Sequence, residues 1–117
     1  MSYNEELATR VRGSLAHLRK VEEKKMFRGV TFMVNSKMCV SVGPDEIMCR
    51  IDPSLHEKAI KRGGCRPVVM KGREYKGFVY VNGDSLKTKR EFDYWINLAL
   101  DFNKRARASK RKKTLER

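Results

Sequence analysis

Apolar residues at every second position predict a β-hairpin in the first half of the chain. They recur in this way over residues 30–34 and again over 38–42, which is the two-residue period of a strand. Asn35-Ser36 between the two runs is typical of a two-residue turn, because Asn tolerates the positive φ that such turns require. The sequence therefore predicts two antiparallel strands joined by a tight turn.

The turn also predicts which residues of the hairpin face each other. It pairs Met33 with Met38 and Phe32 with Cys39. Met33, Met38 and Val40 then share one face, and Phe32 and Cys39 share the other. Because both faces are partly apolar, we expect a sheet that is covered on one side and partly shielded on the other.

Apolar residues at helical spacing predict a helix at the start of the chain. Ser2 and Glu5 have the spacing of a capping box. The helix should end near Arg19 or Lys20, and Val21 then begins a charged link to the hairpin. The apolar stripe of this helix consists of Leu7, Val11, Leu15 and Leu18.

A short second helix is predicted in the middle of the chain. It begins at residues 52–53, Asp-Pro, with Asp as the N-cap and Pro in the first turn. The Gly-Gly pair 63–64 ends it. We expect Leu55 and Ala59 to face inward.

Three more strands and a last helix complete the pattern. The strands are expected at 46–51, 67–70 and 77–81, where β-branched, aromatic or alternating apolar residues occur. Thr88 with Glu91 three residues later marks the start of the last helix. Its apolar stripe consists of Phe92, Trp95, Ile96, Ala99 and Phe102.

The order of these elements indicates the fold class. Strands in local groups separated by helices favour a two-layer α+β fold, α-β(3)-α-β(2)-α, with a mainly antiparallel sheet. The 117 residues are enough for one core. We place this single domain in residues 1–102.

The net charge of +13 is concentrated at the end of the chain. Residues 103–117 hold 8 Lys/Arg and one Glu, a balance of +7, and residues 1–102 hold 19 Lys/Arg and 13 Asp/Glu, a balance of +6. We therefore predict a mildly basic domain followed by a basic C-terminal tail, 103–117. The candidate nucleic-acid-binding cations of this tail are Lys104, Arg105, Arg107, Lys110, Arg111, Lys112 and Lys113.

Cations also flank the hairpin and the last two strands. They are Lys24, Lys25, Arg28, Arg66, Arg73 and Lys76. If these segments lie close together, they form a basic patch with Phe27 and Tyr75 interleaved, a mixture that can bind phosphates and stack bases. A solubilising surface is the simpler interpretation. Of this group, we take Lys24, Lys25 and Arg28 as candidate nucleic-acid-binding residues.

Residues that often carry catalysis or bind metals are not grouped in the sequence. Cys39, Cys49 and Cys65 form no C-x-x-C pair, so we expect reduced, buried thiols. His17 and His56 lie on different predicted helices, where we expect surface or boundary positions. The chain contains no recognised nucleotide-binding or nucleophile motif. We therefore predict no cofactor, no metal site and no catalytic residue.

The sequence also lacks the pattern of a secreted or membrane-spanning protein. The first residues, MSYNEELATR, are polar and unlike a secretory signal. No apolar run approaches the ~20 residues of a membrane span. We expect a cytoplasmic protein that is a monomer or a homodimer.

The methionines have two interpretations. Core filling is the simpler one, and an adaptable binding surface is the alternative, because Met repacks against varied partners. The residues concerned are Met26, Met33, Met38, Met48 and Met70.

Several segments together resemble the N-terminal domain family of the competence regulator TfoX. They are EELATRVR (5–12), EKKMFRG (23–29), FMVNSKM (32–38), IMCRI (47–51) and RPVVMKGREYKGFVYV (66–81). The chain departs from the family pattern at Arg28, where a second glycine is common, and at Tyr75, where Met is frequent. The resemblance implies helices packed on one antiparallel sheet, as in secretion chaperones. It also implies a bacterial cytoplasmic protein without established catalytic residues.

Two functions remain open at this point. The first is a non-enzymatic regulatory or interaction module that binds an unidentified protein partner. The second is a small nucleic-acid-binding protein that uses the tail and the basic patch. The two differ in salt dependence, because binding to a polyanion weakens steeply with salt.

Overall fold

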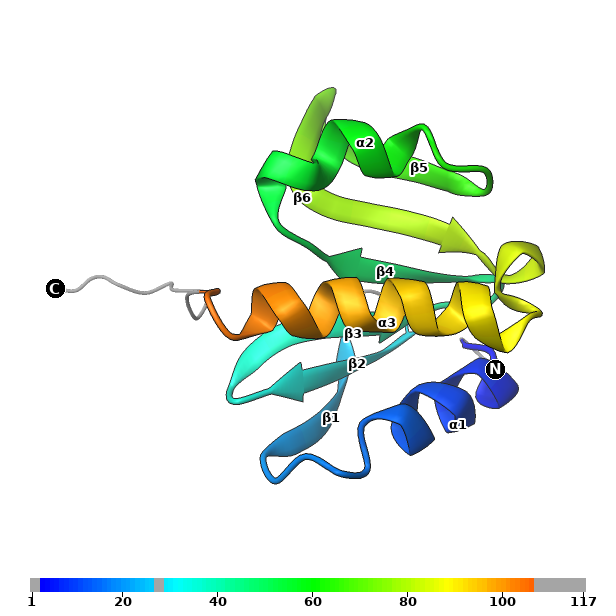
Figure 1. Cartoon of the computed structure of the whole chain (residues 1–117), viewed down its shortest axis with the longest axis vertical. Coiled ribbons are helices and arrows are strands. Elements are labelled where there is room, and N and C mark those ends of the chain that lie inside the picture. The colour runs from blue at the N-terminus through cyan, green and yellow to red at the C-terminus, as the bar shows by residue number, and fades with distance from the viewer. Residues whose placement is uncertain (1–2, 27–28, 107–117) are drawn as a thin grey trace, which may run out of the picture.

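The computed structural model describes residues 3–26 and 29–106 (Figure 1). Six strands in this part of the chain form one antiparallel sheet in the order β1-β2-β3-β4-β6-β5. The predicted α+β class is confirmed, with one strand more than expected. The elements are α1 (Glu5–Ser14), β1 (Val21–Met26), β2 (Gly29–Val34), β3 (Lys37–Val42), β4 (Glu46–Arg50), η1 (Pro53–Leu55), α2 (His56–Ile60), β5 (Cys65–Met70), β6 (Arg73–Asn82), η2 (Gly83–Leu86) and α3 (Lys89–Asn103).

The three α-helices pack on the same face of the sheet. α3 crosses the middle of the sheet and contacts β3 and β4, and α1 and α2 lie on either side of it (Figure 1). One buried cluster contains residues from all three α-helices and from the strands beneath them. The domain therefore has two layers, and none of the described helices covers the other face of the sheet. We call that second surface the helix-free face.

The first helix is shorter than predicted at both ends. Its N-cap is Asn4, not Ser2, because the Asn4 side chain accepts a hydrogen bond from the Leu7 amide at 3.0 Å. The helix ends at Ser14 rather than near residue 20. Gly13 weakens its last turn, since glycine costs roughly 1 kcal/mol relative to alanine in a helix.

The segment that we expected to be a charged link is an edge strand, β1. Val21 is half-buried, and the five residues after it are all exposed. The strand therefore has no apolar alternation, and pairing with β2 alone defines it. Charged side chains are typical of edge strands, where they discourage pairing with other chains.

The predicted turn of the hairpin is confirmed, but the pairing beyond it shifts. Asn35 and Ser36 both have positive φ, 54° and 66°. The register changes by one residue between Phe32 and Met33, so that Phe32 faces Val40 rather than Cys39. Val40 consequently joins Phe32 in the helix-covered core, and our grouping of Val40 with the methionines was wrong.

The middle helix begins as predicted but buries a different residue. The Asp52 carboxylate accepts a hydrogen bond from the Ser54 amide at 2.9 Å, which confirms it as the N-cap. Ala59 is buried, whereas Leu55 is exposed, contrary to our expectation. His56 occupies the buried position instead.

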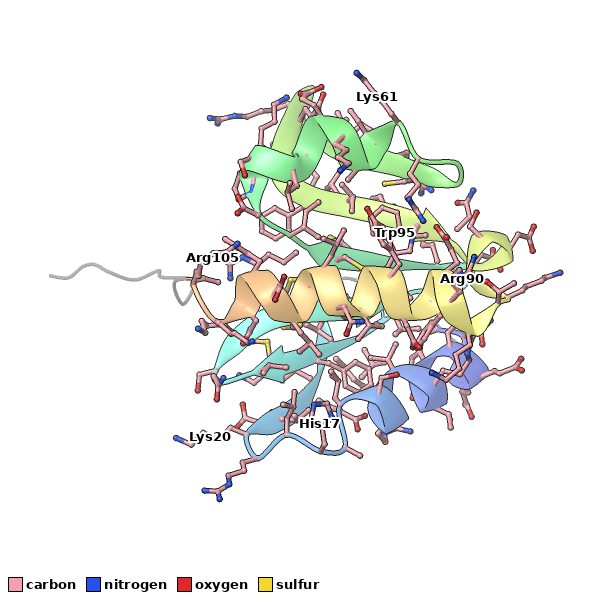
Figure 2. All side chains as sticks on the ribbon, in the orientation of Figure 1. His17, Lys20, Lys61, Arg90, Trp95 and Arg105 are labelled. Carbon is pink, nitrogen blue, oxygen red and sulfur yellow. The ribbon has the colours of Figure 1, made fainter. Side chains whose placement is uncertain are left out.

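The last helix begins at the predicted residue and buries the predicted tryptophan. Thr88 is its N-cap and accepts a hydrogen bond from the Glu91 amide at 3.2 Å. Trp95 is fully buried between α3 and the sheet (Figure 2). The Trp95 indole N–H donates to Glu91 at 3.2 Å, so its one polar group has a partner.

Packing continues beyond α3 into the start of the basic segment. Asn103, the first residue of the expected tail, is buried and donates to the Val34 carbonyl at 3.2 Å. Lys37 donates to the Asn103 carbonyl at 2.6 Å. Arg105 pairs with Asp52 at 2.7 Å, and Ala106 is buried. Contacts with the domain therefore extend through Ala106.

Candidate binding surface

The structure separates cations that the sequence analysis grouped. Lys24 and Lys25 lie on β1 at one edge of the sheet, and Arg66 lies on β5 at the opposite edge. Five strand spacings of about 4.8 Å place these edges roughly 24 Å apart. Figure 2 likewise shows Lys20 and Lys61 at opposite ends of the molecule. The condition for one continuous basic patch, that these segments lie close together, is therefore not met by Lys24, Lys25 and Arg66.

The candidate cations near the tail are only partly described. Lys104 and Arg105 are exposed just beyond α3. Arg105 is engaged by Asp52, and this contact, after the hydrogen bonds from Ser54, helps to lower the pKa of Asp52. The candidates that lie outside the described residues are Arg28, Arg107, Lys110, Arg111, Lys112 and Lys113.

The helix-free face carries an apolar cluster of its own. Side chains alternate along β4, so that Ile47 and Cys49 join the helix-covered core and Met48 points to the other side. Met38 and Met48 are each 7% exposed although no described helix covers them. The cluster consists of Met33, Met38, Met48, Val68, Phe78 and Tyr80.

The five methionines thus fall into two groups by their position. Met33, Met38 and Met48 come from β2, β3 and β4 and lie together on the helix-free face. We call these three residues the methionine patch. Met26 and Met70 lie outside the cluster and are 37% and 47% exposed.

The first half of β6 presents one aromatic ring to the helix-free face. Glu74 and Lys76 both contact side chains of α2 and therefore point toward the helices. Tyr75 lies between them, so strand alternation directs its side chain to the other face. The ring is accessible, because Tyr75 is 37% exposed.

The second half of β6 presents two more rings because the strand changes side at Gly77. Strict alternation after Lys76 would direct Phe78 toward the helices, yet Phe78 and Tyr80 both belong to the helix-free cluster. Gly77 has φ +90° and absorbs this change. Tyr75, Phe78 and Tyr80 consequently line one face of one strand, and we call them the aromatic ladder.

Arginines lie over two rings of the ladder. The Arg66 guanidinium is 4.6 Å from the centre of the Tyr80 ring. Glu46 accepts a hydrogen bond from Arg66 at 2.5 Å, and the Asn82 side chain accepts another at 3.1 Å. Arg50 lies 5.7 Å from the centre of the Phe78 ring. Both distances allow cation–π attraction.

His56 is a buried residue that the sequence analysis placed wrongly. We expected a surface or boundary position, and its side chain is fully buried. The Gly77 amide donates to His56 Nδ1 at 3.1 Å, so the neutral ring carries its proton on Nε2 and donates to Glu74 at 2.6 Å. The helical spacing of His56, Ala59 and Ile60 is the sequence signal that predicts this inward position. His17, by contrast, is exposed, as expected.

The same region contains a possible ligand set for a metal ion. Ligand atoms of His56, Glu57 and Glu74 lie within 4.8 Å of one another. Lys76 forms ion pairs with both carboxylates, and the pair with Glu57 is the main cause of the lowered pKa of Glu57. The Lys76 ammonium therefore supplies a cation to both carboxylates, and we interpret the group as a largely exposed network of ion pairs.

The three cysteines are free thiols, and Cys39 and Cys49 are buried as predicted, whereas Cys65 is only half-buried. Burial raises the pKa of Cys39 to about 12 and that of Cys65 to about 11. Burial also raises the pKa of Cys49 well above its ordinary value. Since the thiolate is the reactive form, these residues are poor nucleophiles at neutral pH.

A cleft of about 1290 Å³ lies between α1 and the start of α3. Its walls carry both signs of charge, including Arg10, Lys89, Asp84 and Asp93, and Lys89 pairs with Asp93 at 2.6 Å. Arg10 itself lies 4.2 Å from the centre of the Phe92 ring. The described residues that line the cleft include no His or Cys, so they do not form the usual nucleophile and base pair.

The fold and the helix-free face together define a small two-layer α+β domain with a Met- and aromatic-lined sheet surface. The chain belongs to the TfoX N-terminal domain family, which matches residues 13–103. This match confirms the resemblance drawn from the sequence segments. Neither the comparison with curated proteins nor that with solved structures gives a match. Among the described helices, none is both long and apolar enough to cross a membrane.

Proposed function

We propose that the protein is a non-enzymatic regulatory module that acts by binding a protein partner in the cytoplasm. The observation that carries this proposal is the methionine patch on a sheet face that no described helix covers. Membership in the TfoX N-terminal domain family supports a regulatory role at the level of the family.

The methionine patch has the properties of an adaptable contact surface. Met33 is half-buried and offers accessible apolar area, and Met38 and Met48 lie behind it. An unbranched thioether side chain changes rotamer easily and fits surfaces of different shape. A partner that covers Met33 removes apolar surface from water, and this burial contributes roughly 25 cal/mol of favourable free energy per Å².

Affinity capture with matched variants tests this proposal. The immobilised protein, Met33→Glu and Leu55→Glu are exposed to bacterial lysate before and after nuclease treatment. Leu55→Glu adds the same charge to an exposed apolar position on the helix side. A partner that survives nuclease and salt, is lost with Met33→Glu and is kept with Leu55→Glu supports the proposal. Equal capture by all three proteins refutes it.

Nucleic-acid binding through the basic residues is the second candidate function. The net charge of +13 and the exposure of Lys24 and Lys25 favour it. If about five tail cations meet phosphates, log affinity should fall with log salt at a slope of about −4.5 on duplex DNA. Truncation after Ala106 should remove most of that slope while keeping the contacts of Arg105 and Ala106. An unchanged slope would show that the tail does not contact the phosphates, and Lys24 and Lys25 would then be the next cations to test.

A further inference from the structure

We propose that the aromatic ladder of β6 binds the bases of a single-stranded nucleic acid. Tyr75, Phe78 and Tyr80 present their rings on the helix-free face, and each is partly exposed. The inference rests on the proposed function only in taking this face as the binding surface. It goes further by assigning a ligand class to residues outside the methionine patch.

The spacing of the rings fits bases that are splayed out rather than stacked in a duplex. Phe78 and Tyr80 are two residues apart on one strand, which separates their backbones by roughly 7 Å. Tyr75 lies farther along the same strand, beyond Gly77. Antiparallel sheets that expose aromatic residues on an open face can stack two or three unpaired bases. A duplex keeps its base faces covered and offers the ladder no comparable contact.

The charges around the ladder favour a polyanion. One cross-strand row of this face begins with Lys24 and ends with Arg66, with Met48 and Tyr80 between them. Arg73 also lies on this face, because its neighbour Glu74 points to the helices and successive side chains of a strand alternate between faces. Arg66 lies on β5 next to the ladder and Arg73 lies on β6 itself, whereas Lys24 is four strands away at the opposite edge of the sheet.

Acidic residues on the same face are fewer or already engaged. Glu46 accepts a hydrogen bond from Arg66, which also holds the Arg66 guanidinium over the Tyr80 ring. A planar guanidinium fixed in this position offers a second surface for a base to stack on. Glu22 faces Met33 near the edge of the sheet, away from the ladder. An acidic protein segment would match the charge but would leave the three rings without a specific role.

Fluorescence anisotropy with labelled 12-residue oligo(dT) and oligo(U) tests the inference on the full chain. Tyr80→Leu should weaken binding roughly 5- to 150-fold, the range expected for one lost base–aromatic stack. The slope of log affinity against log salt should stay the same, because no cation has been removed. Arg66→Gln should instead reduce that slope by about 0.7 on a single strand.

Two further variants separate stacking from a general effect on the fold. Tyr94→Leu is the matched control, because Tyr94 also lies under an arginine, with Arg62 at 3.8 Å from its ring centre, but on the helix side. It should bind as the original chain does. Tyr80→Phe keeps the ring and should keep the affinity. Thermal unfolding followed by circular dichroism shows whether each variant is folded.

The possible results separate this inference from the proposed function. Equal affinity of the original chain and a folded Tyr80→Leu variant overturns the inference. So does an equal loss with Tyr80→Leu and Tyr94→Leu. No binding to either oligonucleotide at about 50 mM salt also overturns it, and the helix-free face then remains a protein surface if Met33→Glu abolishes partner capture. If oligo(dT) binds and Met33→Glu leaves partner capture unchanged, only the protein-docking proposal fails.

Discussion

Gly77→Ala is expected to destabilise the domain more than any exposed glycine substitution, because Gly77 combines two constraints. Its φ is +90°, and a residue with a Cβ pays about 1–2 kcal/mol for left-handed backbone. An added Cβ would also lie 3.1 Å from the Ile51 carbonyl oxygen and 3.1 Å from Pro53 Cγ. A backbone oxygen and a proline ring yield little, so we add about 1–2 kcal/mol for crowding. The expected loss is about 2–4 kcal/mol.

Two other glycines serve as controls for these separate terms. Gly72 also has positive φ, +74°, but an added Cβ would meet nothing within 4 Å. Gly72→Ala should therefore cost only the backbone term, about 1–2 kcal/mol. Gly63 has neither positive φ nor a close neighbour. Gly63→Ala should be neutral or stabilising by up to about 1 kcal/mol.

Urea unfolding followed by Trp95 fluorescence measures all three variants. Trp95 is fully buried in the core, so its emission should shift on unfolding. The expected order of unfolding free energy is Gly63→Ala, then Gly72→Ala, then Gly77→Ala as the least stable. Equal losses for Gly72→Ala and Gly77→Ala would show that the contacts with Ile51 and Pro53 cost nothing. That result would refute the steric part of the reasoning.

Three further predictions concern the core and its ion pairs. Trp95→Ala should lower the free energy of unfolding by about 3–5 kcal/mol in urea titration, as large aromatic truncations do, and a loss below about 1 kcal/mol would contradict its role in the core. At pH 8 Cys65 should react with a disulfide reagent roughly 100-fold and Cys39 roughly 1000-fold more slowly than unfolded thiols, because each unit by which the pKa is raised leaves about tenfold less thiolate; equal rates would contradict this. The hydrogen bond from Arg62 lowers the pKa of Glu91 below 4.5, so its stabilisation is present above that pH and is lost as pH falls through the folded pKa. Melting temperatures between pH 2.5 and 6 should therefore fall less steeply for Glu91→Gln, and parallel curves would argue against the ion pair.

Features that depend on local chemistry were predictable from the sequence. Asn35-Ser36 specified the hairpin turn, and Asp52 and Thr88 specified two helix starts. Asp52 and Thr88 accept hydrogen bonds from backbone amides two or three residues away, and Asn35 tolerates the positive φ of the turn, so each signal lies in a short stretch of sequence. The α+β class followed from the order of such elements.

Features that depend on pairing between segments were not predictable in the same way. β1 carries no periodic apolar pattern, and its alignment with β2 exists only in the folded sheet. The separation of Lys24 from Arg66 follows from the strand order, since these residues lie on opposite edges. A short stretch of sequence does not specify which strands become neighbours, because each strand can pair antiparallel with any of the others.

The helix-free face arises where the regular strand pattern is interrupted. The shift between Phe32 and Met33 moves Val40 into the helix-covered core and leaves Met33 and Met38 on the other side. The change of side at Gly77 turns Phe78 outward. Without these two irregularities, strict alternation would group Val40 with Met33 and Met38 and would direct Phe78 toward the helices. Strand irregularities are frequent next to functional sites because they re-aim side chains at a cost in regular pairing. Two of them acting on the same face support the view that this surface, rather than the cleft beside α1, is where the protein makes its contacts.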